Sequence, residues 1–425
     1  MALQLQGMEK TLADVERYRL VIAALEAAPF EDAQVLIEAM KCALENLEAV
    51  VRASEEGRQL GWWMFCTSPE LFYAFDVQPL CFDPTISGSG DLIMLWNDTA
   101  VDMGFPADIC TVAKASLGAI ALGMVPKPDI IITSSHPCDA IITGYASYKR
   151  LPLLKDVPMF SLESPYVNGE RAESYMVREF KSLIAFLEEQ TGKQLDVDRL
   201  KGFVEESNRA NEYWLEVADL ERAFPAPHNF SLLGAATLAF WFGMALPQGT
   251  FAFKKLAEHL RKRVAEKKGG IPQEKIRVFW YDVFPTFAPT LATWMEQEWG
   301  ANIVVDLVSQ CNYEPVDTSS LDSMLRGLGR KWWATPMARQ HRGPVDFFTE
   351  DMVRLIMDYK IDCVIFPGHV GHKSVGSSMG MLREVCRDLG VPFLALECDV
   401  YDPRVTSEEV LRTQIEEFFK TVVLQ

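Results

Sequence analysis

Short apolar runs alternate along the chain with longer segments in which apolar side chains recur every three or four positions. Runs this short and this apolar are typical of strands buried on both faces of a parallel sheet. The segments between them have the periodicity of amphipathic helices, so the pattern predicts an α/β protein. The runs with the strongest strand character are PKPDIIITSS, VPMFSLESPY, IRVFWYD, NIVVDLV, CVIFPGH and PFLALECD.

The stretch at residues 61–82 predicts several short elements in succession. It reads GWWMFCTSPELFYAFDVQPLCF, which favours a strand, a break at Ser68-Pro69, a short helix and a second strand. The glycines of SGSG at residues 87–90 are expected to form a loop that precedes a further strand. Cys110 lies at the apparent start of a helix, with Asp108 in its first turn.

The helical segments divide the chain into four parts. Residues 1–58 are helical in pattern, and a second helical and charged stretch at 171–270 ends within the charged linker RVAEKKGGIPQEK. The alternating units occupy residues 59–170 and 271–425. We therefore expect two open parallel-sheet lobes of the Rossmann or flavodoxin type, joined by a helical insert and preceded by an N-terminal helical segment.

Charge and hydropathy exclude several classes of partner. The formal net charge is −18 at pH 7, and nucleic acids and anionic membranes need a basic surface instead. Residues 231–253 are apolar enough to be considered as a membrane span, but Gly, Pro and Ser interrupt them. A buried helix followed by a turn is the expected structure. The N-terminus lacks the pattern of a signal peptide, so we expect a cytoplasmic protein.

The cysteine pattern indicates reduced thiols and none of the common metal motifs. The nine cysteines are an odd number, and no signal peptide precedes them, so a disulfide framework is not expected. There is no CxxC pair, which excludes the zinc-finger and bacterial ferredoxin spacings. Phosphate-binding loops, nucleophile elbows and HExxH motifs are also missing from the sequence.

Potential metal ligands follow predicted strands. In open α/β sheets, ligands bind at the carboxyl ends of the strands. Cys138 follows DIIITSS and His372 follows CVIFPG, and with Cys110 these residues lie on three loops that could converge on one cleft. Soft sulfur ligands and an imidazole suit an iron–sulfur cluster or zinc. By spacing alone, two buried thiols and a hydrogen-bonded loop histidine explain the pattern as well.

Several motifs together resemble the 2-hydroxyacyl-CoA dehydratase family, which includes the benzoyl-CoA reductase subunits. They follow the family's order and span nearly the whole chain. They are CTSPELFYAFDVQP, FPADICTVAKASLGA, SSHPCDAI, LKDVPMFSLESPY, the helical stretch KSLIAFLEEQTGKQLDVDRLKGFVEESNRANEYW and the ending LGVPFLALECDVYDPRVTSEEVLRTQIEEFF.

The resemblance implies a [4Fe-4S] cluster, of which Cys110 and Cys138 would be the first two ligands. The family's third cysteine is missing, because the corresponding loop reads GHVGHKSVG and has His372 in its place. Either His372 is a nitrogen ligand, or the third ligand is lost and the cluster is altered or missing. Cys363 lies nine positions earlier and is expected to point into the core.

The resemblance also implies partners and chemistry. These are a homologous second subunit in a heterodimer or larger assembly, an ATP-hydrolysing iron–sulfur activator that injects one electron, and an acyl-CoA substrate that passes through a ketyl radical. Glu70 would contact substrate or relay a proton, or be only a helix-start carboxylate. Ser134, Ser135 and His136 would line the pocket, with Ser135 and His136 as candidate catalytic residues, or His136 would be only a loop residue in contact with water. The alternatives are a subunit of a benzoyl-CoA-type ring reductase and a non-catalytic partner that transfers electrons or completes the cleft.

Overall fold

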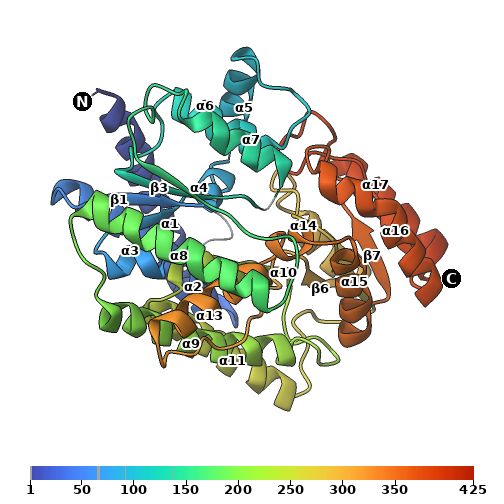
Figure 1. The fold of residues 1–425 in the computed structure, drawn as a ribbon. Coiled ribbons are helices and arrows are strands. Elements are labelled where there is room, and N and C mark those ends of the chain that lie inside the picture. The colour runs from blue at the N-terminus through green and yellow to red at the C-terminus, as the bar shows by residue number, and fades with distance from the viewer. Residues whose placement is uncertain (1, 65–67, 91, 137) are drawn as a thin grey trace.

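The protein contains two four-stranded, wholly parallel sheets (Figure 1). The structure is a computed structural model that describes residues 2–64, 68–90, 92–136 and 138–425. The first sheet has the strand order β2-β1-β3-β4, and the second has the order β6-β5-β7-β8. The predicted α/β class with two parallel-sheet lobes is therefore confirmed.

The first lobe contains the strands that its apolar runs predict, with α6 (Thr111–Ala121) and α7 (Asp139–Tyr148) on one side of the sheet and α8 (Glu170–Thr191) on the other (Figure 1). Residues 65–67, at the end of the first predicted strand, lie outside the described residues, as does residue 137. The elements are β1 Leu60–Trp63, α3 Glu70–Ala74, β2 Gln78–Cys81, α4 Phe82–Ser87, α5 Leu92–Asp102, α6 Thr111–Ala121, β3 Ile130–Ser134, α7 Asp139–Tyr148 and β4 Met159–Leu162.

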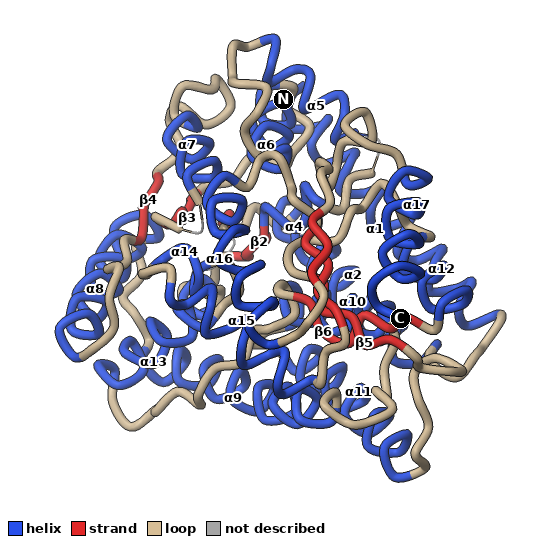
Figure 2. The backbone as a smooth tube through the Cα atoms, turned by 90° about the vertical axis from the view of Figure 1, so that its right-hand side faces the viewer, coloured by secondary structure: helices blue, strands red, loops and turns tan. Residues whose placement is uncertain are grey.

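The second lobe, which lies at the C-terminal end of the chain, also has helices on both sides of its sheet (Figure 2). Every residue of β5, β6 and β7 is buried, as a sheet covered on both faces requires. The elements are β5 Ile276–Trp280, α12 Leu291–Trp294, the π-helical turn η1 Met295–Trp299, β6 Ala301–Asp306, α13 Leu321–Ala334, α14 Ala338–Arg342, α15 Asp346–Tyr359, β7 Cys363–Phe366, α16 Lys373–Leu389, β8 Phe393–Ala395, α17 Glu408–Phe418 and η2 Phe419–Val423.

Helices form the N-terminal segment and the connection between the sheets. The apolar segment at 231–253 forms all but the first residue of one helix, a turn and the start of the next helix, as expected. Among the residues that the structure describes, no helix is both long and apolar enough to cross a membrane. The helices are α1 Ala2–Ala27, α2 Ala33–Glu55, α8 Glu170–Thr191, α9 Val197–Leu220, α10 Phe230–Gly243 and α11 Pro247–Ala265.

Two local predictions were wrong. The segment at residues 87–90, whose first residue ends α4, precedes helix α5 and not a strand, because the apolar positions of LIMLWNDTAV pack with helical periodicity around Trp96. Helix α6 begins at Thr111, so Asp108 lies before the helix and not in its first turn. Its carboxylate forms an ion pair with Lys373 at 3.1 Å instead.

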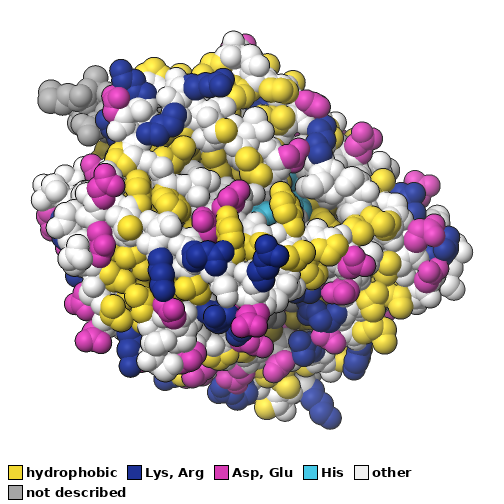
Figure 3. Space-filling view, in the orientation of Figure 1, with side chains coloured by type: hydrophobic (Ala, Val, Ile, Leu, Met, Phe, Trp, Pro, Cys, Tyr) yellow, Lys and Arg dark blue, Asp and Glu magenta, His cyan; other side chains and the backbone are white. Residues whose placement is uncertain are grey.

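Both sheets have the same strand order when each is numbered from its own first strand. In each sheet the order reverses between the first and third strands, β1 and β3 or β5 and β7. Such a switch point leaves a crevice at the carboxyl ends of the two strands, where open α/β proteins bind ligands. The acidic excess is not gathered on the face drawn in Figure 3, where charges of both signs are interspersed.

Candidate metal centre

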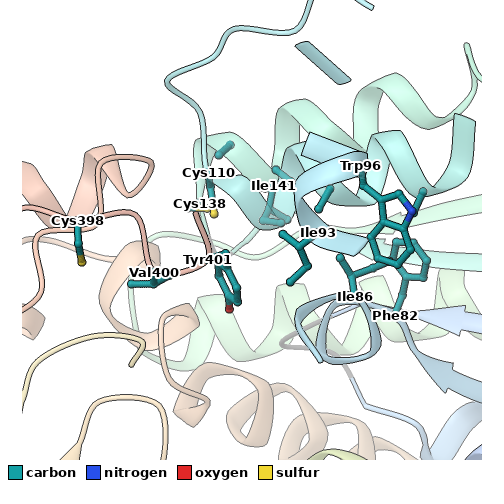
Figure 4. Packing of buried hydrophobic residues seen from close by; sticks show 14 of the residues in the cluster. Phe82, Ile86, Ile93, Trp96, Cys110, Cys138, Ile141, Cys398, Val400 and Tyr401 are labelled. Atoms are coloured by element: carbon teal, nitrogen blue, oxygen red, sulfur yellow. The ribbon is translucent and has the colours of Figure 1, made fainter. Parts of the chain in front are cut away.

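A cavity of about 410 Å³ lies between the two lobes and the helical insert. Cys110 and Cys138 from the first lobe and His372 from the second all contribute to its wall. Figure 4 shows the two cysteines close together at the edge of a buried hydrophobic cluster, with Tyr401 nearby. The sequence therefore predicted three residues that do meet at one cavity; their binding of metal stays a prediction.

Each of these three residues immediately precedes a helix. Cys110 is the N-cap of α6, Cys138 of α7 and His372 of α16. Cys138 and His372 occupy equivalent places in the two lobes, since each follows the third strand of its sheet. A helix N-terminus carries partial positive charge and free backbone N–H groups. Three of them at one cavity favour an anionic group, such as a thiolate-bound cluster.

The tightest group of ligand atoms at the cavity includes a residue that the sequence analysis missed. The Cys110 sulfur and one ring nitrogen each of His369 and His372 all lie within 4.8 Å of one another. All three residues are buried. Cys138 lines the same cavity but does not belong to this compact group. The signal for His369 was its place after β7, three residues before His372.

The electrostatics of the site favour the thiolate form of Cys110. Burial alone would raise the pKa of its thiol, but hydrogen bonds and charge from His369 and His372 lower that pKa to about 5. Metals bind the thiolate form, which is therefore present at neutral pH. Burial and the neighbouring Cys110 charge raise the pKa of Cys138 to about 12. A cation between the two sulfurs would remove this repulsion.

His372 is held by a buried carboxylate. Its Nδ1 lies 2.9 Å from Oδ2 of Asp282, which follows β5 at the switch point of the second sheet. Burial lowers the pKa of His372, but Asp282 and Cys110 outweigh burial and raise it well above its usual value. Asp282 has a φ of 141°, an unfavourable conformation for a residue with a side chain, and such strain clusters at functional sites.

The loop that carries the histidines packs directly against the start of α6. Thr111 donates to Oδ2 of Asp399 at 2.5 Å, which joins the first helix turn to the segment after β8. A Cβ atom placed on Gly371 would lie only 2.3 Å from the Cα of Cys110. The short distance between the lobes at this point therefore requires glycine at position 371.

Replacing Gly371 with alanine should push the histidine loop away from Cys110. Because the added methyl group meets backbone that cannot easily move, we expect a loss of about 1–3 kcal/mol in unfolding free energy and a lower metal content. Gly376 is the control, since nothing lies within 4 Å of a Cβ there and alanine should stabilise α16 by about 0.4–1 kcal/mol. Chemical unfolding and metal analysis measure both effects, and equal behaviour of the two variants would contradict this interpretation.

The donor set fits the iron–sulfur group that the resemblance implies. Two cysteines and a carboxylate-supported histidine face one cavity, and three helix N-termini surround them. A carboxylate on the distal nitrogen of a histidine is the usual support of a metal ligand. Three protein ligands would leave one iron of a four-iron cluster open to a substrate. The compact Cys110–His369–His372 group by itself would also suit a single ion.

The three other predicted site residues lie away from this cavity, and their catalytic roles stay predictions. Glu70 is fully buried and pairs with Lys331 Nζ at 2.5 Å. Ser135 Oγ accepts from the backbone of Ser164 at 3.1 Å. His136 is buried against the ring of Trp332, with ring centroids 6.0 Å apart. None of Glu70, Ser135 and His136 is among the residues that line the cavity.

The cavity also has an acidic residue that the sequence did not single out. Asp306 ends β6 and is among the residues that line the cavity. Burial raises the pKa of its carboxyl group to about 6, although the backbone of Ser309 donates to Oδ1 at 2.6 Å. In the sequence, only its place in the predicted strand NIVVDLV distinguished Asp306 from the many other acidic residues of the chain.

Comparisons with known proteins agree with the geometry. The family model described as 2-hydroxyglutaryl-CoA dehydratase, D-component, matches residues 64–422. The chain is 23% identical over 389 residues to the (R)-phenyllactyl-CoA dehydratase alpha subunit of Clostridium sporogenes, covering 86% of this chain and 90% of that protein. It is 21% identical over 392 residues to the (R)-2-hydroxyisocaproyl-CoA dehydratase alpha subunit of Clostridioides difficile, covering 88% and 92%. A benzoyl-CoA reductase subunit of Thauera aromatica is 21% identical over 360 residues, covering 79% and 80%. The chain therefore belongs to the 2-hydroxyglutaryl-CoA dehydratase D-component family, as its motifs indicate.

Proposed function

We propose that this chain is the iron–sulfur subunit of an enzyme that dehydrates a 2-hydroxyacyl-CoA thioester. The observation that carries the proposal is the meeting of Cys110, Cys138 and His372 at one cavity between the lobes, in a chain of this family. These three residues would hold a [4Fe-4S] cluster, with His372 bound through Nε2. When bound, the cluster supplies a strongly reducing electron, which side chains cannot provide, and a Lewis-acidic iron.

The cavity wall favours an apolar acyl group. Most of the side chains around the proposed ligands are hydrophobic, and the volume of about 410 Å³ suits an acyl group and its thioester with the bulk of coenzyme A outside. Dry apolar walls also keep water away from a reactive radical. The dehydratase relatives named above act, by their names, on phenyllactyl and hydroxyisocaproyl thioesters. The apolar lining residues include Val112, Ile141, Leu238, Trp241, Phe242, Val283 and Phe284.

The proposed reaction also requires acid–base catalysis, for which Asp306 is suited. Dehydration removes the hydroxyl group from C2 and a proton from C3, which leave as water while the thioester becomes a 2-enoyl thioester. The injected electron is returned in the same cycle. A carboxyl group with a pKa of about 6 in the cavity is a carboxylate at neutral pH and can accept the C3 proton.

Replacing Asp306 with asparagine should lower kcat by about 10²- to 10⁴-fold without changing iron content. In the unchanged protein, the rate should fall as the pH drops below about 6, because Asp306 then takes up a proton. Glu221→Gln is a matched control: Glu221 is a nearby buried carboxyl group whose pKa burial raises to about 8, and it does not line the cavity. Steady-state kinetics measure both variants. Equal kcat values for both variants would refute the role of Asp306.

The proposal includes two protein partners. The relatives are named as subunits of dehydratases and of a reductase, which supports assembly with a homologous second subunit. An ATP-hydrolysing iron–sulfur activator would deliver the electron. A subunit of an aromatic-ring reductase is the second candidate, supported by the aromatic side chains of Trp241, Phe242 and Phe284 in the cavity wall and by the benzoyl-CoA reductase relative.

Anaerobic purification with the partner subunit tests the proposal. We expect about four iron and four sulfide per cluster, together with ATP- and activator-dependent conversion of an apolar 2-hydroxyacyl-CoA to the 2-enoyl-CoA. Conversion of benzoyl-CoA to a ring-reduced product would instead favour the second candidate. If the chain binds neither iron nor sulfide under conditions in which the partner subunit does, it is not the iron–sulfur subunit.

A further inference from the structure

The two histidines near Cys110 make different hydrogen bonds. We propose that only His372 is a metal ligand, and that His369 instead donates a hydrogen bond from Nε2 to the Cys110 sulfur. This inference rests on the proposed function, because it concerns the metal centre of that enzyme. It also decides between the two ligand sets that the site offers.

The contacts of His372 make Nε2 the ring nitrogen that can bind a metal. Nδ1 lies 2.9 Å from a carboxylate oxygen of Asp282, which can only accept a hydrogen bond, so Nδ1 carries a proton. The remaining nitrogen, Nε2, hydrogen-bonds the Cys110 sulfur, and it offers a lone pair once a metal displaces its proton. His372 also lines the cavity, where a metal would lie.

In His369 the two ring nitrogens have the opposite roles to those in His372. Its Nδ1 accepts a hydrogen bond from the backbone N–H of Val400 at 3.3 Å, so Nδ1 carries no proton. In the neutral ring the proton is therefore on Nε2. The nearby carboxylate of Asp399 lies 3.8 Å from Nδ1, too far for a hydrogen bond. That carboxylate is occupied by Thr111 and by the backbone N–H of Tyr401.

The Cys110 sulfur is the acceptor that remains for this Nε2–H group. Nε2 of His369 is buried and has no hydrogen-bond partner among the described residues, so its N–H group still needs an acceptor. A ring nitrogen of His369 belongs to the compact group around the Cys110 sulfur, and His369 does not line the cavity. His369 therefore lies on the side of the Cys110 sulfur that faces away from the cavity, where it donates a hydrogen bond to this ligand.

A donor in this position has a specific effect. A hydrogen bond to a metal-bound sulfur withdraws negative charge from it, and such bonds help to set the reduction potential of iron–sulfur centres. His369 would therefore make the centre easier to reduce without contributing to the number of ligands. For His369 to bind metal through Nε2, Nδ1 would need a proton, and the Val400 N–H would then lose its acceptor.

The variants His369→Ala and His372→Ala separate the two roles after anaerobic reconstitution. We expect His369→Ala to keep its iron and sulfide but to have a more negative midpoint potential in an EPR-monitored titration. His369→Gln, whose side-chain amide can donate, should recover part of the shift. We expect His372→Ala to lose most of its iron. His259→Ala, outside the cavity, is the control. Loss of iron from His369→Ala to the extent seen in His372→Ala, or an unchanged potential, would overturn the proposal.

A second measurement uses the unchanged protein without bound metal, so it depends neither on the folding of a variant nor on iron binding. Nitrogen-15 NMR of the metal-free protein, labelled at its six histidines, reports the protonation of each ring nitrogen. We expect His369 to carry its proton on Nε2 and to have a bare Nδ1, and His372 to be protonated on Nδ1. A proton on Nδ1 of His369 would refute the inference even if the protein binds iron. Failure of the unchanged protein to bind iron would instead refute the proposed function.

Discussion

Replacing Cys110 with alanine should abolish iron binding while leaving the fold intact. Cys110 is the residue on which the proposed cluster and the compact sulfur–imidazole group both depend. Loss of a residue that merely supports a ligand already costs about 10- to 100-fold in metal affinity, so loss of a thiolate ligand should cost at least as much. Anaerobic iron and sulfide analysis, with circular dichroism to confirm folding, measures the effect.

Cys386→Ala provides the control for this variant. Cys386 is also a buried cysteine, but it lies in α16 within the core of the second lobe and away from the cavity. Its replacement should leave the iron content unchanged. If Cys110→Ala retained as much iron as Cys386→Ala, the proposed centre would be wrong.

Replacing Lys331 with methionine should destabilise the protein by about 3–5 kcal/mol, because it leaves the carboxylate of Glu70 buried without its cation. Glu70 is completely buried, and Lys331 and Ser207 donate to its Oε1 at 2.5 and 2.6 Å. Removing the exposed Lys181–Asp322 pair through Lys181→Met should cost less than about 1 kcal/mol. Denaturant unfolding midpoints compare the two. Similar shifts in both variants would contradict this estimate of the buried pair.

The pH dependence of the Lys331→Met defect provides a further check. Burial alone would raise the pKa of Glu70, but Lys331 and two serine hydroxyls outweigh it and lower that pKa below its ordinary value of 4.5. The pair therefore stabilises the fold at neutral pH, and this contribution is lost as the pH falls through the folded-state pKa. Without Lys331, burial raises the pKa of Glu70, so its carboxyl group is already neutral at a higher pH. The difference in unfolding free energy between the unchanged protein and Lys331→Met should therefore become smaller as the pH falls.

The strands were predictable from sequence because burial on both faces leaves a strong signal. Runs such as IIITS and CVIF contain few polar residues, and each became a central strand between helix-covered faces. Helices α4 and α5 were missed because short apolar stretches next to glycines fit strands and helices equally well. The four segment boundaries stay predictions.

The ligand candidates were partly predictable, and their supporting groups were not. Cys110, Cys138 and His372 could be found because each belongs to a motif or follows a predicted strand. Asp282 and His369 also follow strands, but their roles depend on hydrogen bonds to His372 and Val400 that only the folded chain creates. The sequence alone does not show which ring nitrogen of a histidine lies next to a carboxylate.

The residues predicted as catalytic show the limit of reasoning from motifs. Glu70 stands in a recognisable segment, but its partner Lys331 lies 261 positions away, so the sequence did not reveal the buried ion pair. The weakly distinguished Asp306 reached the cavity wall through the end of β6. For the lining of the cavity, position at a strand end was thus the more informative signal, and the catalytic roles of both carboxylates stay predictions.

Iron-specific anomalous scattering from anaerobically grown crystals of the purified chain with its partner tests the central claim most directly. We expect iron density in the cavity between the Cys110 and Cys138 sulfurs and Nε2 of His372, with the shape of a four-iron cluster. A cavity without iron, or a single ion held by Cys110, His369 and His372, would contradict the claim.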